Sequence, residues 1–455
     1  MKIIVCGAGR VGQGIARRLA SDGHNVTIID ADPDLVNAVT SDLEVQGVTG
    51  HASHPDVLRS AGGADADMIV AVTYSDEVNM VTCQVAEVLF QTQTKIARIR
   101  SQAYSHELFG RDGMAVDVMI SPEKVVADSI FQRLQTPGAF FSNHFAKKKI
   151  RCVGIEIQEE TPLARTTLSQ ISELFPGLHI RVLAIVRNEK LFAATPSDQL
   201  LAGDRAYLAI ETSQVERLSE LLGLSDRSDQ RILIVGAGNI GLAVALQLEK
   251  RRGRKVRLIE ADLERAEMAA SSLNRSIVLH GEGLNPAILE EGGAGQADAV
   301  IGLTNDDRVN LLAMSMAKRL GAKKTIALVN DQELEPIHRT LDVDVVLDPR
   351  AVTVSQILLK LRKGRILALY SIESGQGEIA EGEVLEHSPL LDSDLTEKSL
   401  PEGIVAGAVL RGDDILFPAR DFKVMVGDRV VLFYEQNRVR KVEQLFRASS
   451  AYFIS

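Results

Sequence analysis

Short apolar runs alternate with stretches of helical periodicity in the N-terminal part of the chain. Runs rich in Val and Ile occupy 3–6, 26–29, 68–72, 96–99 and 116–120, and helical spacing of apolar residues covers 10–22, 33–41 and 77–90. Alternating strand and helix signals are typical of βαβ units, whose parallel strands are covered by helices on both faces. The pattern therefore predicts an α/β domain with a doubly wound parallel sheet.

The chain then repeats this pattern. Residues 2–32 (KIIVCGAGRVGQGIARRLASDGHNVTIIDAD) align with residues 231–262 (RILIVGAGNIGLAVALQLEKRRGRKVRLIEAD), and the match continues as far as 117–134 against 344–361. A long period that occurs only twice indicates a duplicated domain and not a solenoid.

A strand-rich stretch follows each half, at 145–222 and 364–447, and these stretches also resemble each other. In both, a hairpin turn (187–190 and 411–414) precedes a Gly-Asp turn, at Gly203-Asp204 and Gly427-Asp428. We predict linkers at 137–148 and 223–230.

The predicted fold class is therefore α/β, with two Rossmann-like doubly wound parallel-sheet domains, each followed by a small α+β domain. The predicted boundaries are 1–123, 143–227, 230–348 and 365–450.

A helix that begins with proline follows the last strand of each half. Ser121-Pro122 and Asp348-Pro349 each supply an N-cap residue and a proline at the first helical position. The helices carry apolar residues at Val126, Ile130 and Leu134, and at Ile357, Leu358 and Leu361. This stripe completes the local core, or it packs on another subunit or on the partner copy; the sequence leaves both open.

Composition and charge exclude several classes. The 455 residues are 45% hydrophobic and 25% charged, as in globular proteins, and the net charge of −10 disfavours binding to nucleic acid. The uncharged run 232–248 approaches membrane length, but its glycines favour a strand, a turn and a helix. Three scattered cysteines and an N-terminus without a signal-peptide pattern lead us to expect a reducing, cytoplasmic location and a buried Cys6.

The glycine turns are the strongest chemical motif. GAGRVG (7–12) and GAGNIG (236–241) each follow a strand and open a helix, and Asp30 and Glu260 end the next strand. This is the dinucleotide fingerprint, in which the turn brings the pyrophosphate to the helix N-terminus. The acid accepts hydrogen bonds from the ribose hydroxyls and would repel a 2′-phosphate, so NAD is favoured over NADP. The candidate binding residues are Gly7, Ala8, Gly9, Arg10, Val11, Gly12 and Asp30, with Gly236, Ala237, Gly238, Asn239, Ile240, Gly241 and Glu260 in the second copy.

Residues at the ends of later strands complete the candidate sites. Thr73 and Tyr74, and Thr304 and Asn305, follow the fourth strand, beside the switch-point crevice where ligands bind. Ser75 or Asp76, and Asn305 or Asp306, are alternatively helix caps, and both roles are compatible.

Three cations distinguish the first copy from the second. The sequence leaves three roles open for Arg98 and Arg100. They are solvated surface cations, they neutralise ligand phosphates, or they carry a link to the next subunit. The second copy has Leu328 and Asn330 there, and Asn239 in place of Arg10, so we expect the two sites to differ.

Other chemistry finds little support. His51 and His54 are expected to be solvated loop residues and not metal ligands, and no catalytic triad, HExxH motif or P-loop lysine occurs. An NAD-dependent oxidoreductase is the alternative, but the small domains contain few ionisable residues in apolar surroundings. A redox-sensing repressor would need a helix-turn-helix and a basic face.

GAGRVG (7–12), GHASHPDVL (50–58) and VTYSDEVN (72–79) make the chain resemble the TrkA family of tandem RCK (regulator of potassium conductance, or KTN) proteins. The resemblance covers essentially the whole chain. It implies a non-enzymatic regulatory subunit, peripheral on the cytoplasmic face of the inner membrane. Such a subunit assembles as a homo-oligomeric ring beneath a potassium-transporting TrkH- or TrkG-type subunit and senses NAD(H), with ATP or ADP possible at the first site.

Overall fold

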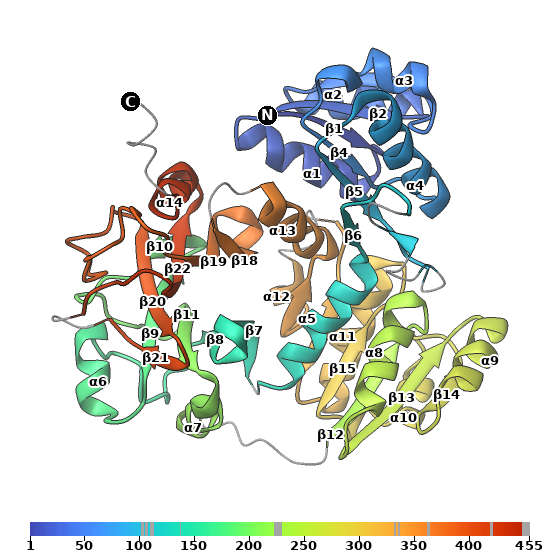
Figure 1. Ribbon diagram of the computed structural model, residues 1–455. Helices are drawn as coiled ribbons and strands as arrows, with labels where there is room; N and C mark the ends of the chain where they lie inside the picture. The colour runs from blue at the N-terminus through green and yellow to red at the C-terminus, as the bar shows by residue number, and fades with distance from the viewer. Residues whose placement is uncertain are drawn as a thin grey trace, which may run out of the picture. The chain divides into compact units, whose positions relative to one another are not determined.

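The computed structural model describes residues 1–101, 104, 108–109, 113–136, 138–222, 230–331, 334, 337–361, 365–418 and 422–447 (Figure 1). They form two compact units. The first unit holds Met1–Val126 with Asp348–Ile357, and the second holds Ala127–Leu347 with Leu358–Ser455. The predicted division into four domains stays a prediction.

The first unit contains a six-stranded parallel sheet in the order β3-β2-β1-β4-β5-β6. This is the doubly wound order: the strands are all parallel, and the direction in which successive strands are added to the sheet reverses between β1 and β4. The strands are β1 (Lys2–Cys6), β2 (Asn25–Asp30), β3 (Gln46–Thr49), β4 (Met68–Ala71), β5 (Thr94–Arg98) and β6 (Val118–Ile120). The helices are α1 (Arg10–Ser21), α2 (Pro33–Asp42), α3 (Pro55–Ser60) and α4 (Asp76–Val85), which a π-helical turn (Ala86–Phe90) extends.

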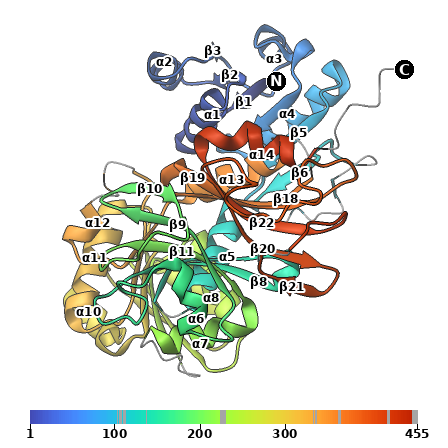
Figure 2. The ribbon, with the colours of Figure 1, turned by 90° about the vertical axis from the view of Figure 1, so that its left-hand side faces the viewer.

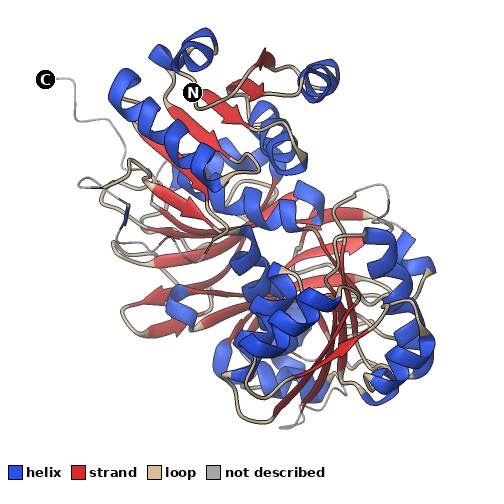
Figure 3. Cartoon of the chain, turned by 90° about the vertical axis from the view of Figure 1, so that its right-hand side faces the viewer, coloured by secondary structure: helices blue, strands red, loops and turns tan. Residues whose placement is uncertain are grey.

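The second copy repeats this sheet as β14-β13-β12-β15-β16-β17, inside the second unit. Helices line the sheet where it is seen from the side in Figure 3. Its strands are β12 (Gln230–Val235), β13 (Arg254–Glu260), β14 (Ile277–His280), β15 (Ala299–Gly302), β16 (Thr325–Leu328) and β17 (Val345–Leu347). Its helices are α8 (Asn239–Glu249), α9 (Leu263–Ser272), α10 (Pro286–Glu291), α11 (Asp307–Leu320) and α12 (Ile337–Thr340).

Two details of the α/β halves correct or confirm the sequence analysis. The apolar runs did not predict β3, because this edge strand of sequence QGVT has three exposed residues and a half-buried Val48. The uncharged run 232–248 forms most of β12, a turn and α8, as predicted. No helix in the described part of the chain is both long and apolar enough to cross a bilayer.

The proline-led helices are α5 (Pro122–Leu134) and α13 (Pro349–Leu361), and each packs on the other copy. A β-carbon on Gly14 of α1 would lie 3.9 Å from Arg350 and Val354 of α13. In the second unit, Gln247 of α8 donates to Asp128 of α5. Both helices therefore contact the partner copy, which is one of the roles that the sequence left open, and their residues Val126, Ile130, Ile357 and Leu358 are fully buried.

The two small modules are antiparallel sheets of equivalent order, β7-β8-β11-β9-β10 and β18-β19-β22-β20-β21 (Figure 2). The first comprises β7 (Ala139–Phe145), β8 (Ile150–Glu156), β9 (Ile180–Arg187), β10 (Lys190–Ala193) and β11 (Arg205–Glu211), with α6 (Ile171–Leu174) and α7 (Val215–Leu221). The second comprises β18 (Ile366–Ile372), β19 (Gly377–Glu383), β20 (Ile404–Arg411), β21 (Asp414–Leu416) and β22 (Arg429–Glu435), with α14 (Val439–Leu445).

The predicted hairpins and Gly-Asp turns are present, but one predicted linker is wrong. Asn188 and Glu189 both adopt positive φ between β9 and β10, as a tight hairpin turn requires. Most of the supposed linker at 137–148 is strand β7, whose Phe141, Ser142, Asn143 and Phe145 are buried. The linker predicted at 223–230 lies outside the described residues except for Gln230, which begins β12.

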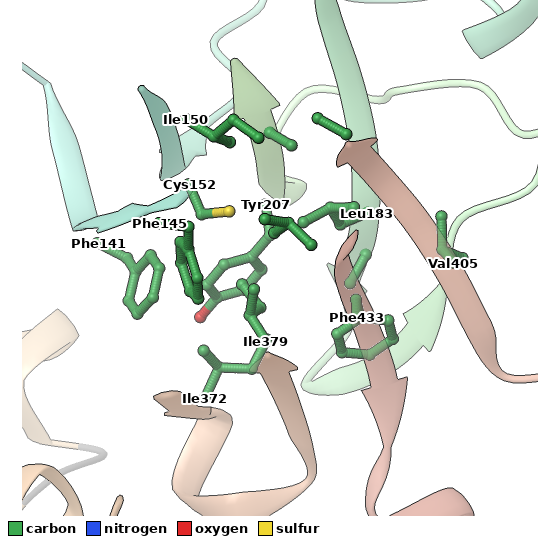
Figure 4. Packing of buried hydrophobic residues seen from close by; sticks show 14 of the residues in the cluster. Phe141, Phe145, Ile150, Cys152, Leu183, Tyr207, Ile372, Ile379, Val405 and Phe433 are labelled. Atoms are coloured by element: carbon green, nitrogen blue, oxygen red, sulfur yellow. The ribbon is translucent and has the colours of Figure 1, made fainter. Parts of the chain in front are cut away.

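The small modules share one hydrophobic core. Figure 4 shows Phe145, Cys152 and Tyr207 of the first module against Ile379 and Phe433 of the second. At its edge, the Tyr207 hydroxyl donates to the Glu373 carboxylate, which also pairs with Arg205 at 2.8 Å. Because apolar burial is the main favourable term in folding, this core ties the two modules together.

Lys324, immediately before β16, is expected to make the stability of the fold depend on pH in the alkaline range. Its ammonium donates to the carbonyl oxygens of Ala139 at 2.8 Å and Arg133 at 3.2 Å. Burial, and secondarily the Arg133 guanidinium, lower the pKa of Lys324 to about 8, against a partial opposing effect of Asp344. Between pH 8 and 10.5 the unfolded chain therefore binds more protons than the folded one, so this group adds stability as pH rises, up to about 3 kcal/mol.

The measurement is the unfolding midpoint of wild type and Lys324→Met at several pH values. Wild type should gain stability relative to the variant from pH 8 toward pH 10.5, the window between the folded and unfolded pKa values. A difference that stays constant over that window would contradict the assignment.

Candidate functional site

Two glycines of the first turn are required by the chain's own packing. Gly7 has φ +109°, and a β-carbon there would lie 3.0 Å from backbone atoms of Val72 and Thr73. A β-carbon on Gly12 would lie 1.7 Å from the Gly7 carbonyl oxygen. These two residues let α1 start directly against the end of β1.

Gly9 is different, because nothing in the fold demands a glycine there. Its φ of −68° suits any residue, and a β-carbon would meet no atom within 4 Å. Gly9 is exposed and is the N-cap of α1, with no side-chain cap and no acidic residue in the first turn. The first N–H groups of a helix lack intrahelical partners and attract anions, so this position is an open cradle for a phosphate group.

Asp30 holds the turn in place. Its Oδ2 accepts from the N–H of Ala8 at 2.6 Å, and its Oδ1 accepts from the N–H of Asp32 at 3.0 Å. The sequence predicted a role toward the ribose and missed this structural one. The carboxylate stays half-exposed and retains lone pairs for a second acceptor role.

The ends of β4 and β5 are joined by Asn79, a fully buried residue that sequence reasoning did not single out. Its Oδ1 accepts from the N–H (2.8 Å) and hydroxyl (2.7 Å) of Thr73, and its Nδ2 donates to the carbonyl oxygen of Arg98 at 2.9 Å. Repetition of this asparagine in VTYSDEVN and LTNDDRVN was the available signal. Ser75 caps α4 by accepting from Val78, as the capping alternative predicted.

The cations of the first copy are largely neutralised, which corrects the expected charge difference. Arg98 pairs with Glu123 at 3.3 Å, and Arg100 lies 3.6 Å from Asp76. Arg10 is exposed and makes no ion pair within the described residues. Carboxylates on α4 and α5 supply the counter-charge to Arg98 and Arg100, which leaves Arg10, replaced by Asn239 in the second copy, as the unpaired cation among these three in the described residues.

The second turn has the same geometry. Gly236 has φ +104°, a β-carbon on Gly241 would lie 1.9 Å from the Gly236 carbonyl oxygen, and Gly238 has open space. Asn239 and Ile240 begin α8, which also lacks a side-chain cap. Glu260 accepts from the N–H of Ala237 at 2.7 Å but is only 7% exposed, so it is less accessible to a ligand than Asp30.

The second crevice has the same internal bracing and a more polar mouth. Asn310 repeats the bonds of Asn79, to Thr304 and to the carbonyl oxygen of Leu328. Asp306 caps α11, and Asn305 is exposed beside it. Asn330 donates to Asp307, the counterpart of Asp76.

Metal and thiol chemistry find no support in the described part of the chain. The His51 and His54 rings lie 5.3 Å apart, but no group of three potential ligands occurs among the described residues. Cys6, Cys83 and Cys152 are buried and free. Burial raises the pKa of the Cys83 thiol to about 12 and that of Cys6 further, so both stay protonated.

Comparison with known proteins fits this architecture. The TrkA-N domain family matches residues 3–122 and 232–349, and the TrkA-C domain family matches 152–223 and 379–447. The crystal structure of the GsuK RCK domain aligns with a TM-score of 0.63 at 19% identity, over 98% of this chain and 95% of that one. The GsuK channel bound to NAD gives the same TM-score and identity, over 98% and 79%. Fold and glycine turns thus define a protein of two consecutive RCK-type units.

Sequence relatives specify the family. A Trk system potassium uptake protein TrkA of Azorhizobium caulinodans is 44% identical over all of both chains, and those of Halomonas elongata and Haemophilus influenzae are 35% and 34% identical over all of both chains. The chain belongs to the family of the Trk system potassium uptake protein TrkA. This confirms the predicted fold class, the potassium transport assignment and the prediction of a non-enzymatic protein.

Proposed function

We propose that the chain is a nucleotide-sensing regulatory subunit that binds NAD(H) and gates a membrane potassium-transporting subunit of the TrkH/TrkG type. The observation that carries this proposal is the pair of open, uncapped cradles at Gly9 and Gly238. The fold needs the other glycines of each turn, whereas close approach of a ligand to the backbone accounts for a glycine at these two positions.

NAD(H) is the proposed ligand because of the acids that end the second strands. Asp30 and Glu260 lie at hydrogen-bonding distance from the glycine turns and would repel a 2′-phosphate. The GsuK channel, which shares the fold, has been solved bound to NAD and to ADP.

ATP or ADP is proposed as an additional ligand of the first site. Arg10, at the first position of α1, is exposed and would face extra phosphate charge, whereas Asn239 offers none in the second copy. The binding residues proposed for both sites are those predicted from the sequence, including Thr73, Tyr74, Arg98, Thr304 and Asn305.

The Trk system named in the relatives' descriptions supports a proposal about the partner and the assembly. We propose a homo-oligomeric ring, peripheral on the cytoplasmic face of the membrane, in which α/β units from different chains meet. An NAD-dependent oxidoreductase is the competing proposal, and steady oxidation of NADH by the purified chain with a carbonyl substrate would favour it.

Serine at position 9 is expected to weaken nucleotide binding at the first site strongly without weakening the fold. The side chain fits the open space, and its hydroxyl can cap α1, which takes up the N–H groups that a phosphate needs. Gly238→Ser is the matched change in the second copy. Calorimetric titration with NADH should show each single variant losing its own site, and the double variant binding on the order of 100-fold more weakly.

Thermal unfolding serves as the control, since serine is a favoured N-cap and the midpoint should not fall. A folded double variant that binds NADH like wild type would refute the proposed sites.

A further inference from the structure

Tyr74 is the most conspicuous exposed aromatic residue at the first crevice. Its side chain is 84% exposed at the carboxyl end of β4, one residue after Thr73, whose N–H lies 3.0 Å from the position of a β-carbon on Gly7. The backbone that carries Tyr74 therefore lies next to the turn that forms the proposed cradle.

Arg100 fixes the position of this ring. Its guanidinium carbon lies 4.2 Å from the Tyr74 ring centroid, and its Nη2 donates to the Tyr74 carbonyl oxygen. Asp76 in turn accepts from the N–H of Arg100 at 3.0 Å and lies 3.6 Å from its Nε. The ring is thus held by a chain of contacts that leads back to the first turn of α4.

This arrangement suits a flat, uncharged ring better than a phosphate. The charge of Arg100 is already balanced by Asp76, and Glu77 is the next residue along α4. One face of the tyrosine ring is occupied by the guanidinium, which leaves the opposite face for a planar group. Stacking on aromatic side chains tolerates any nucleobase because every base has a π-face.

The second copy lacks both the tyrosine ring and the arginine that holds it. Asn305 replaces Tyr74, and Asn330, which replaces Arg100, donates to Asp307 at 2.9 Å. The backbone around them is otherwise equivalent, since Asn310 and Asp307 repeat the bonds of Asn79 and Asp76.

We infer that Tyr74, supported by Arg100, is a stacking platform for a heteroaromatic ring of the nucleotide bound in the first site, and that the second site has none. The inference rests on the proposed function. Either ring of NAD(H), adenine or nicotinamide, has the required chemistry. The platform makes the first site the tighter of the two, independently of phosphate charge.

The test uses the full chain carrying Gly238→Ser, so that only the first site is read. Calorimetric titrations use ADP-ribose, which offers adenine alone, and nicotinamide mononucleotide, which offers nicotinamide alone. Tyr74→Asn, the residue of the second copy, should weaken binding of one of these probes roughly 5- to 150-fold, and Tyr74→Phe should restore it. The probe that responds identifies the stacked ring.

Two further readouts separate stacking from a structural role. Because Tyr74 is so exposed, Tyr74→Asn should leave the unfolding midpoint unchanged. The chain has no tryptophan, so quenching of tyrosine fluorescence by the effective probe should occur in wild type and diminish in Tyr74→Phe. In a Gly9→Ser background, Asn305→Tyr with Asn330→Arg should tighten binding at the second site.

Unchanged affinity of Tyr74→Asn for both probes would overturn the inference while the proposed function stands. If wild type bound neither NADH, nor ADP-ribose, nor nicotinamide mononucleotide, the proposed function would be refuted, and the stacking platform with it.

Discussion

Gly12→Ala is expected to cost about 3 kcal/mol or more of local stability in the first α/β unit. The new β-carbon would lie 1.7 Å from the Gly7 carbonyl oxygen, a backbone atom that cannot rotate away. Either α1 moves off the end of β1 or the glycine turn rearranges. Hydrogen exchange localised to residues 2–30 is the suitable measurement, because it reports the local opening of this segment.

Gly241→Ala is the matched change in the second copy, with its β-carbon 1.9 Å from the Gly236 carbonyl oxygen. It should accelerate exchange in residues 230–260 and leave residues 2–30 protected. If residues 2–30 in Gly12→Ala and residues 230–260 in Gly241→Ala exchanged as slowly as in wild type, the turns would tolerate a side chain. The glycines would then need another explanation.

Arg187→Met is expected to destabilise the first small module by about 3–5 kcal/mol. Arg187 donates to both carboxylate oxygens of Asp204, at 2.8 and 2.7 Å, and Asp204 is only 2% exposed. The buried partner is the acid, so removal of the arginine leaves an uncompensated buried carboxylate. Asp204→Asn should cost less, because the remaining Arg187 is one-third exposed and can be solvated.

The pH dependence distinguishes this mechanism from simple loss of packing. An unpaired buried carboxylate has a raised pKa, so the penalty in Arg187→Met should shrink as pH falls through the range in which aspartate protonates. Thermal unfolding at neutral and acidic pH makes the comparison. Arg411→Met, which breaks the equivalent pair with the 1% exposed Asp428, should behave alike in the second module. A penalty independent of pH in both variants would show that charge burial is not the cause.

Periodicity and repetition predicted the α/β halves, the hairpins and the glycine turns, because these depend on local sequence. Gly7, Gly9 and Gly12 are recognisable from spacing alone. Spacing does not reveal that, of these three, only Gly9 could carry a β-carbon without a steric clash. That distinction needs the position of the Gly7 carbonyl oxygen. Similarly, the edge strand β3 escaped because its exposed residues produce no apolar run.

Charge pairing was the main property that sequence could not supply. The sequence leaves Arg98 and Arg100 available for phosphate, but in the structure they pair with Glu123 and Asp76, which are 25 and 24 residues away along the chain. Contacts over such separations depend on which helix follows which strand in the folded sheet. The packing of α5 and α13 on the opposite copy could not be predicted from the sequence either. An apolar stripe indicates that a helix face is buried, but not which surface covers it.

Potassium flux is the most direct test of nucleotide-dependent regulation. The measurement is uptake into proteoliposomes that hold a TrkH/TrkG-type subunit, with wild type or the Gly9→Ser/Gly238→Ser double variant added, in the presence and absence of NADH. The account predicts that NADH changes the flux with wild type and has no effect with the double variant, although both chains bind the membrane subunit. An equal response to NADH from the two chains would contradict it.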